Sequence, residues 1–416
     1  MKPKIAIIFP ADWWDPSYSL CSVVENQLRS FVKYGYEVTV CTLARFNGEI
    51  SIKGVVHKKI LPLFEYTDYS QTDKLDPHFE EQVQAVQRAL EDNLKGYTHV
   101  ITHDLIFQGW FLVHNVAVRR ANLQVKWLHW IHSAPHERKD AAYPFNHFYL
   151  LKPNEKLIYL NDIDKIKAAE MFGVFPADVA VVPNAIDPRT FWGLHPFTEH
   201  LLDKYDILGA DIISVYPLST PRMISGKQLH KAVRIHEHLK KLYGLKTKYI
   251  VCNAHANAQK EKDLVKETQE TFMGGGLSPN EVIFTSFEEA PAYEVGVPRQ
   301  VVKELFQLSN LFLFPSISEN CSLILLEAAL SGNLLVLNKS FLPMRAQLGD
   351  QALYFDFGAL GAEVHYDNEA KYYEDVAKII FAELKNNKPI MSQVKIRQEF
   401  NGDVIFRKHI EPLLYA

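Results

Sequence analysis

The sequence has few cysteines, and none of them is placed as a zinc ligand or a disulfide partner usually is. Its four cysteines are scattered along 416 residues without any C-x-x-C pair, at Cys21, Cys41, Cys252 and Cys321. Such spacing suggests neither a zinc site nor a disulfide framework. We therefore expect reduced thiols that are mostly buried.

Long apolar runs and an excess of charge of either sign are also missing. No uninterrupted apolar stretch approaches the roughly 20 residues that a membrane helix requires. The start, MKPKIAIIFPADWW, lacks the long apolar region and cleavage site of a signal peptide. With 45 Lys+Arg against 49 Asp+Glu, the formal net charge is only −4. We expect a cytoplasmic protein with no integral membrane segment and no electrostatic bias toward nucleic acid or anionic membranes.

Short β-rich apolar runs alternate with helical patterns over most of the chain, which predicts an α/β fold with parallel sheets. The length predicts two domains of roughly 200 residues, and the pattern restarts after the loop-like DPRTFWGLHPF. Helices are expected at 22–34 and 77–94, among others. The predicted strands are 4–9, 37–43, 99–102, 125–131, 156–160 and 179–183, then 211–218, 248–253, 281–287, 310–316, 333–338 and 352–357.

One segment, residues 310–338, reads strand, turn, helix, glycine, strand. It contains SENCSLILLEAALSG, in which Asn320 or Ser322 can cap the helix start and Gly332 suits the left-handed position that ends it. The first turn of such a helix presents free N–H groups and a partial positive charge, which suits a phosphate or diphosphate. Glu319 stands at the mouth of this helix, so a ligand there would meet a carboxylate as well.

Glu327 lies inside the apolar part of the same helix, roughly 12 Å beyond Glu319 if the whole interval is helical. Taken alone, a glutamate on a helix is most simply a surface residue. Leu325, Leu326, Ala328 and Ala329 surround it in sequence, however, so we expect a partly buried carboxylate that needs a hydrogen-bonding partner. A pair of sugar hydroxyls would provide one.

These residues resemble the E-x7-E signature of the retaining, nucleotide-sugar-dependent glycosyltransferases of the GT-B fold. The match runs from Glu319 to Glu327 within FPSISENCSLILLEAALSGNLLVLN. The resemblance implies two Rossmann-like, doubly wound domains that face each other across a cleft. It also implies that Glu327 contacts the donor ribose and Glu319 the transferred sugar.

A second segment, YPLSTPRMISGKQL (216–229), resembles the family's loop after the first strand of the donor domain. There Arg222 and Lys227 would hold the donor diphosphate and neutralise the leaving group without a metal. Their other interpretation is a pair of solvated charges in a Gly/Ser loop. The resemblance further places Tyr293 near the nucleobase. Beside the donor sugar it places Asn320, Cys321, Ser322 and Leu323, where Asn-Cys-Ser replaces the family's usual Gly-Phe-Gly.

The segment VVPNAIDPRTF (181–191) is similar to the family's sequence at the end of the first domain, with Ala185 in place of the usual glycine. We interpret Asn184 and Asp187 as turn and linker residues. The implied domains are an acceptor-binding domain at 1–195, a donor-binding domain at 196–395, and a last helix at 396–416 that crosses back to the first domain.

Histidines follow or end two predicted strands of the first domain. In VKWLHWIHSAP the resemblance favours His132 as the residue near the donor sugar, whereas His129 is interpreted as an ordinary polar group at a strand end. In VITHDLIF, His103 and Asp104 occupy a similar position. They either line the acceptor side or cap the next helix.

The loop after the first strand, FPADWWDPSYSLCS (9–22), is bulky and aromatic where family members usually carry glycines. Trp13, Trp14 and Tyr18 would form a stacking platform for a ring-bearing acceptor. The alternative is that they only pack the loop down.

Asp162 and Asp164 form a D-x-D pair, which is the metal-and-diphosphate motif of the other major glycosyltransferase fold. They follow KLIYLN and precede IKAAEMF, so we interpret Asp162 as a helix cap. We expect no metal and no cofactor besides the donor substrate, a UDP- or GDP-linked sugar.

The resemblance implies a metal-independent hexosyl- or pentosyltransferase that acts on a hydroxyl of a glycan, a lipid-linked precursor or a small molecule. One alternative acceptor is nucleic acid, namely a hydroxymethylated base of phage DNA extruded into the aromatic loop. The absence of basic excess counts against it. An alternative of another class is a non-catalytic nucleotide- or carbohydrate-binding protein, motivated by the altered 320–322 segment.

Overall fold

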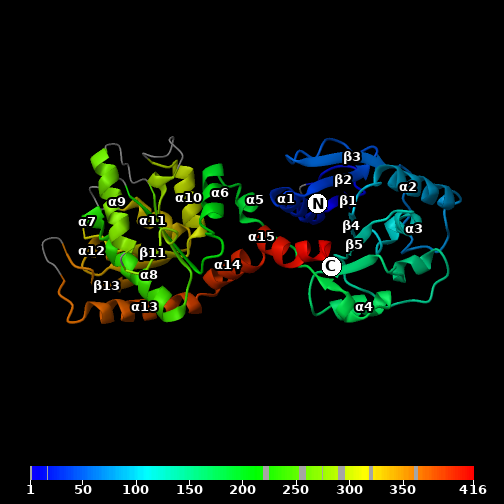
Figure 1. The fold of residues 1–416 in the computed structure, drawn as a ribbon. Coiled ribbons are helices and arrows are strands. Elements are labelled where there is room, and N and C mark those ends of the chain that lie inside the picture. Colours follow the sequence, from blue (N-terminus) through cyan, green and yellow to red (C-terminus); the bar gives the residue numbers. More distant parts are fainter. Residues whose placement is uncertain are drawn as a thin grey trace. The chain divides into compact units, whose positions relative to one another are not determined.

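The computed structural model describes residues 2–15, 17–218, 224–252, 259–273, 275–288, 296–317, 322–359 and 364–416. Their contacts divide the chain into two units. Unit 1 comprises Met1–Asp187 and Glu399–Ala416, and unit 2 comprises Pro188–Gln398. In each unit, helices surround one parallel sheet (Figure 1).

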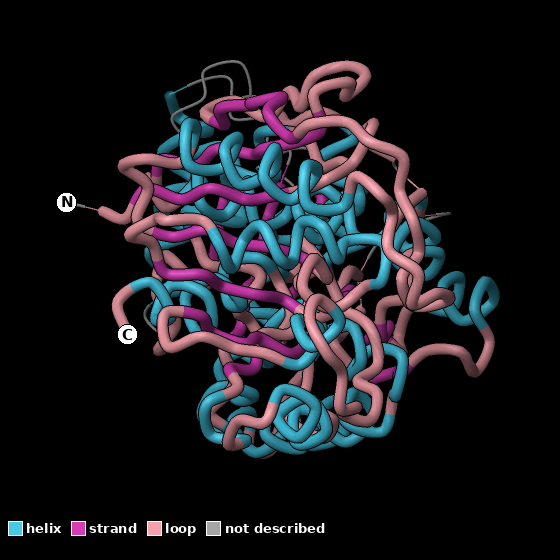
Figure 2. Tube along the Cα trace, turned by 90° about the vertical axis from the view of Figure 1, so that its right-hand side faces the viewer, coloured by secondary structure: helices cyan, strands magenta, loops and turns pink. Residues whose placement is uncertain are grey.

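The sheet of unit 1 has seven strands in the order β3-β2-β1-β4-β5-β6-β7, and all neighbouring pairs are parallel. In Figure 2 strands lie side by side, with helices and loops around them. The strands are β1 (Lys4–Ile8), β2 (Glu37–Leu43), β3 (Val55–Leu61), β4 (His99–His103), β5 (Lys126–Trp130), β6 (Glu155–Tyr159) and β7 (Ala180–Val181).

Both faces of this sheet are buried, because side chains that alternate along β1 enter two separate cores. Ile5 and Ile7 pack with α1 (Ser19–Lys33), whereas Ala6 and Ile8 pack with α2 (Phe79–Asn93) and α3 (Leu112–Arg120). The helices of unit 1 are α1 (Ser19–Lys33), α2 (Phe79–Asn93), α3 (Leu112–Arg120) and α4 (Lys165–Phe172), with the 3₁₀ turns η1 (Gly109–Phe111), η2 (Phe145–Tyr149) and η3 (Pro176–Asp178).

The C-terminal segment of the chain packs on the α1 side of unit 1. It consists of α15 (Gly402–Ile405), the π-helical turn η7 (Phe406–Ile410) and η8 (Glu411–Leu414). The Phe406 ring is fully buried and meets the rings of Phe31, Tyr34 and Tyr36 at centroid distances of 5.3, 4.6 and 5.8 Å. The Tyr36 hydroxyl donates to Glu411 over 2.7 Å. One aromatic cluster therefore joins the two ends of the sequence.

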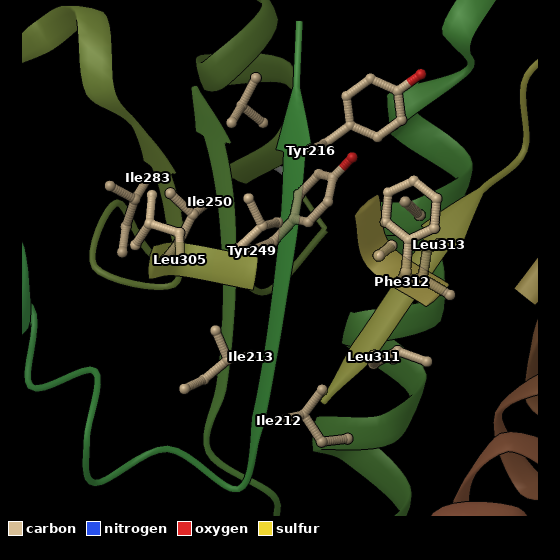
Figure 3. Close-up of a cluster of buried hydrophobic side chains, with 14 of the residues drawn as sticks. Ile212, Ile213, Tyr216, Tyr249, Ile250, Ile283, Leu305, Leu311, Phe312 and Leu313 are labelled. Carbon is tan, nitrogen blue, oxygen red and sulfur yellow. The ribbon is translucent and has the colours of Figure 1, made fainter. Parts of the chain in front are cut away.

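The sheet of unit 2 has six parallel strands in the order β10-β9-β8-β11-β12-β13. They are β8 (Ile212–Pro217), β9 (Thr247–Cys252), β10 (Val282–Phe284), β11 (Leu311–Phe314), β12 (Leu334–Asn338) and β13 (Leu353–Phe355). Ile213, Ile250 and Ile283 point to one side of this sheet together with Leu305, and Tyr216 and Tyr249 to the other (Figure 3).

Helices cover both faces of this second sheet. Helix α8 (Leu229–Tyr243) lies on the side of Tyr249, because its His236 ring meets the Tyr249 ring at 5.4 Å. Helix α10 (Arg299–Leu308) supplies Leu305 to the other side. The helices are α5 (Pro188–Trp192), α6 (Pro196–Lys204), α7 (Ile224–Lys227), α8 (Leu229–Tyr243), α9 (Gln259–Met273), α10 (Arg299–Leu308), α11 (Leu323–Leu330), α12 (Leu342–Leu348), α13 (Glu369–Asn386) and α14 (Lys388–Glu399), with the 3₁₀ turn η5 (Thr285–Phe287).

The predicted fold class, α/β with two doubly wound parallel sheets, is confirmed. The sequence pattern missed β3, an edge strand whose residues are mostly half-exposed, so that it has no apolar run. The prediction of buried free thiols is confirmed for Cys21, Cys41 and Cys252, while Cys321 lies outside the described residues. Among the helices described, none has the length and apolar character needed to cross a membrane.

Replacing Phe406 by alanine should destabilise unit 1 by about 3–5 kcal/mol, because it removes a fully buried ring between three aromatic neighbours. Urea unfolding followed by tryptophan fluorescence measures this, since of the six tryptophans only Trp192 lies in unit 2. Phe175→Ala is the matched control, as that ring is 78% exposed. Equal midpoints for the two variants would contradict the packing described above.

Acid should destabilise both units, because each contains a buried neutral histidine. Burial lowers the pKa of His114 in unit 1 and of His236 in unit 2 to about 3, whereas an unfolded histidine titrates near 6.5. Below about pH 6.5 the unfolded chain binds more protons than the folded one, so stability falls as the pH falls.

Each of these histidines should cost about 2 kcal/mol of unfolding free energy between pH 7.5 and 5.0. Urea unfolding at both pH values measures the loss. His236→Gln should show a smaller loss than the wild type, whereas His78→Gln, at an exposed histidine, should match it. An identical pH dependence for wild type and His236→Gln would refute this account.

Candidate functional site

Both sheets reverse their strand order at one point, between β1 and β4 in unit 1 and between β8 and β11 in unit 2. At such a point the loops that follow the two strands leave toward opposite faces, which opens a crevice at the carboxyl ends of the strands. The segments after β8 and β11, with helix α11, contain the residues predicted to bind the donor except Tyr293, which follows β10 in the sequence. The loops after β1 and β4 contain most of those predicted to bind the acceptor.

Direct hydrogen bonds join the two loops in unit 2. The Ile317 N–H donates to the Gly226 carbonyl over 3.2 Å, and the Gln228 side-chain amide donates to the Pro315 carbonyl over 2.7 Å. Gln228 has a left-handed backbone with φ of 52°, which turns the chain from α7 into α8. The segment with Lys227 therefore lies beside the end of β11.

Lys227 is buried, with 7% of its surface exposed, at the end of α7. Next to it, the side chains of Gln228, His230 and Lys231 line a cavity of about 740 Å³. Burial, followed by the charge of Lys231, lowers the pKa of His230. Gly358 and Tyr366 also line this cavity. This cavity has the volume of a small-molecule site and lies beside the order reversal.

Asn338, at the end of β12, holds the loops near this cavity in place. The sequence pattern did not identify this residue. Its fully buried side-chain amide donates to the carbonyls of Ser316 and Gly358 over 3.1 and 2.7 Å. Its oxygen accepts from the N–H groups of Ser340 and Phe357 over 3.1 Å each. The loops after β11 and β13 are thereby held to one strand end.

Helix α11 spans Leu323–Leu330, so it begins after Ser322, and Gly332 occupies the left-handed position after its end, as predicted. Ser322 is the N-cap residue, although its hydroxyl makes no capping bond, and Gly332 has a φ of 77°. The Asn333 N–H donates to the Ala328 carbonyl and the Gly332 N–H to that of Ala329, which is the Schellman pattern. Leu323, the first helical residue, is 66% exposed.

Glu327 has a partner that the sequence did not reveal. Its carboxylate accepts from Arg299, the first residue of α10, over 2.8 Å. The Glu327 side chain is 32% exposed and that of Arg299 86% exposed. Leu326 and Leu330 on the same helix are also exposed, so the apolar neighbours do not enclose Glu327. The expected hydrogen-bonding partner is an arginine at the surface of unit 2.

The remaining predicted donor residues cannot be placed, because Arg222, Tyr293, Glu319, Asn320 and Cys321 lie outside the described residues.

In unit 1, the aromatic loop after β1 is held by the segment that follows β2. Arg45 donates to both carboxylate oxygens of Asp12, over 2.7 and 2.6 Å. Asn47 bonds through its N–H to the Asp12 carbonyl over 2.6 Å and forms a β-bridge with Trp13. These bonds fix the loop at the carboxyl end of β1.

The three aromatic side chains of this loop have different surroundings. The Trp14 ring packs edge-on against Phe9 at 5.7 Å and joins the core on the α1 side. Trp13 and Tyr18 instead line a cavity of about 410 Å³, together with Tyr66 and Trp110. Packing of the loop therefore accounts for Trp14 but not for Trp13 or Tyr18. The sequence pattern did not identify Tyr66 and Trp110, which come from the segments after β3 and β4.

The predicted residues His103, Asp104 and His132 form one buried network at the ends of β4 and β5. His103 Nδ1 lies 2.8 Å from His132 Nε2, and His103 Nε2 lies 3.1 Å from the Gln27 side-chain oxygen on α1. Burial lowers the pKa of His103 well below its ordinary value and also lowers that of His132. Both rings are therefore neutral near pH 7.

The Asp104 carboxylate supports the same network through hydrogen bonds to neighbouring residues. One carboxylate oxygen accepts from the His132 N–H over 2.7 Å, and the other from Ser133 and Gln108 over 3.2 Å each. His103 and Asp104 are only 2% and 4% exposed. Their side chains thus support His132 and do not form a surface for an acceptor.

Two other sequence interpretations concern polar residues outside these loops. His129 is fully buried, with Nδ1 2.8 Å from the Thr102 hydroxyl, which is the expected behaviour of a structural histidine. The interpretation of Asp162 as a helix cap is wrong. α4 has Asp164 as its N-cap residue, Asp162 pairs with Lys165 over 2.7 Å, and the Asn161 side chain accepts from the backbone N–H groups that precede the helix.

No cluster of three or more metal-ligating side chains occurs in the part of the chain that the structure describes.

Comparisons with known proteins give only weak structural similarities. The sequence matches no protein-family model and no curated protein. A glycosyltransferase from Rickettsia africae is similar at 14% identity and a TM-score of 0.37, covering 99% of this chain and 97% of that one. HepE of Anabaena, solved in complex with UDP-glucose, has 14% identity and a TM-score of 0.33, with 100% of both chains covered.

Asp104→Asn should destabilise unit 1 by about 1–3 kcal/mol, because an amide cannot accept from all three donors around it. Asparagine keeps the left-handed backbone, where φ is 51°. Asp104→Ala should therefore cost more, since it adds backbone strain. Urea unfolding compares the two. If both variants were as stable as the wild type, the Asp104 carboxylate would not stabilise this network as described.

Proposed function

We propose that this protein is a retaining, metal-independent glycosyltransferase of the GT-B type, which moves a sugar from a nucleotide-diphosphate sugar to a hydroxyl acceptor. The observation that carries the proposal is the position of the sequence motifs. Lys227 and the Ser322 end of α11 lie on neighbouring loops at the order reversal of unit 2. Open parallel sheets bind nucleotides at this place.

Unit 2 would hold the donor. Lys227, with Arg222, would neutralise the diphosphate as the sugar–phosphate bond breaks, and the first N–H groups of α11 would add their partial positive charge. Glu327 would accept hydrogen bonds from the ribose hydroxyls. Because Arg299 occupies one of its carboxylate oxygens, the other oxygen is the one available to a ribose.

Unit 1 would hold the acceptor. His132 would contact the sugar as a neutral hydrogen-bonding group, since burial lowers its pKa. His103 and Asp104 would fix its position. Glu319 would contact the sugar near its reacting carbon, and retention would follow from attack on the face that the leaving phosphate occupies.

The alternative is a nucleotide-binding protein without turnover. It is favoured by the ion pair between Arg299 and Glu327, which provides the carboxylate with a partner inside the protein, and by the altered 320–322 segment. Turnover of a nucleotide sugar distinguishes the two functions.

The test is release of UDP or GDP from a panel of nucleotide sugars, with and without a chelator. Lys227→Met keeps most of the side-chain volume but removes the charge, so it should lower kcat/KM by about 100-fold or more. Glu327→Gln should raise the KM for the donor by about 10-fold, through a weakened hydrogen bond to the ribose. Chelation should change neither rate.

Lys303→Met and Glu383→Gln are the matched controls, because both side chains are exposed on helices of the same unit, and both should behave as the wild type. Thermal stabilisation by free UDP or GDP without any turnover of the panel would establish the binding protein instead. The absence of both stabilisation and turnover would refute both functions.

A further inference from the structure

Two cavities lie at the carboxyl edge of the unit 1 sheet, on either side of the η1 turn. The first, of about 410 Å³, includes Trp110 and Tyr66 in its lining, and the second, of about 590 Å³, includes Phe107 and Tyr69. Residues 107–111 and 66–73 thus each contribute to both cavities. We call the structure between them, formed by η1 and the turn at 68–70, the ridge.

The ridge is closely packed at Gly109. A Cβ atom on this residue would lie 2.3 Å from both the Ser70 nitrogen and an Asp68 carboxylate oxygen, so only glycine allows the turn and η1 to approach so closely. The turn is closed by the same Asp68 oxygen, which accepts from the Ser70 N–H and hydroxyl over 3.0 and 2.7 Å. The two cavities therefore have a fixed wall in common.

The first cavity exposes aromatic surface that the fold does not need. Trp13, Trp110 and Tyr18 are 56%, 48% and 47% exposed around it. Several large exposed rings around one hollow indicate a binding surface rather than scattered surface residues. They offer flat apolar faces on which a ring can lie.

One polar atom of the first cavity points to the same conclusion. The hydroxyl of Tyr66 is buried yet has no hydrogen-bonding partner in the described structure. Leaving such a group unsatisfied costs about 1–3 kcal/mol. A small shift of this side chain on binding would bring the hydroxyl to a ligand hydroxyl and restore the missing bond. The Tyr66 ring itself stacks with that of His114 at 5.8 Å.

The charges of the first cavity exclude an anionic ligand. Its charged lining residues are Asp12 and Asp15, of which Asp12 is already paired with Arg45. A phosphate or a sugar acid would meet carboxylate oxygens and no cation of the lining. A neutral, hydroxyl-rich ring instead buries its C–H face on the indoles and bonds its hydroxyls to the carboxylates.

The second cavity continues the same chemistry beyond the ridge. Aromatic side chains form one part of its lining, among them Phe107, Tyr69 and Phe145. Hydroxyl and amide groups form another, among them Gln71 and Thr72. The charged residues of this lining are two acids and one base, Asp73, Asp140 and Lys139, so the cavity does not favour an anion. Its rings and uncharged polar groups suit further sugar units of one chain.

We propose that the acceptor is a neutral oligosaccharide that lies across the ridge, with its terminal sugars in the first cavity and the next ones in the second. The inference rests on the proposed transferase function and adds the class of its acceptor. The chain contributes both cavities from unit 1 alone, so binding is measurable without the donor.

The experiment is binding of the full-length protein to an array of neutral and acidic glycans, from mono- to tetrasaccharides, with DNA carrying hydroxymethylcytosine as a further probe. The best ligand is then titrated by calorimetry. Trp13→Ala and Trp110→Ala should each weaken its binding by about 10-fold, and Tyr66→Phe by about 5-fold. Phe107→Ala should weaken only the longer glycans. Phe175→Ala removes an exposed ring elsewhere in unit 1 and should change nothing.

The inference is overturned if no neutral oligosaccharide binds, if acidic glycans or the DNA bind best, or if Trp13→Ala and Phe175→Ala behave alike. It is also overturned if a single sugar binds as tightly as its longer chains. Its failure is distinguishable from failure of the transferase function. Stabilisation by UDP or GDP needs only unit 2, and slow hydrolysis of the nucleotide sugar does not need Trp13, so both persist in the Trp13→Ala protein.

Discussion

The order of the parallel strands is the constraint on which both candidate sites depend. In each unit the first strand is central, with the second strand on one side and the fourth strand of its series on the other. The chain must then leave the first strand toward one face of the sheet and return on the other, because crossovers between parallel strands are right-handed. The crevice is a consequence of this topology. The topology alone also places the residues that follow the central strands along the crevice.

Buried polar side chains fix the positions of the loops that border these crevices. Asn338 ties together the loops after β11 and β13, and Asp104 ties the end of β4 to the end of β5. Each such group would be costly if unpaired, and each is paired with backbone groups of a neighbouring strand end. The same bonds that make burial tolerable thus hold the loops after β11 and β13 in unit 2 and the backbone of His132 in unit 1.

Much of the fold follows from the sequence because strands that are buried on both faces of a parallel sheet read as near-continuous apolar runs. The strand-end residues were found for the same reason, since they directly follow such runs. The partners that define each site were not found, because tertiary packing brings them from far away. Arg299 is 28 residues from Glu327, and Gln27 is 76 residues from His103.

The aromatic loop shows the same limit. Trp13 and Trp14 are adjacent and chemically identical, yet one is exposed at a cavity and the other packs on Phe9. The difference depends on the β-bridge between Trp13 and Asn47, which no local pattern in the sequence reveals. Likewise, β3 is a strand because β2 offers it an edge to pair with, and not because its own residues are apolar.

The central claim is that a nucleotide sugar binds at the order reversal of unit 2. Hydrogen–deuterium exchange with and without saturating UDP or GDP tests it most directly, because exchange slows where a ligand orders the backbone. The account predicts slower exchange in peptides that cover residues 224–231 and 322–330, with little change in α13 or α14. Protection confined to unit 1, or no protection by either nucleotide, would contradict it.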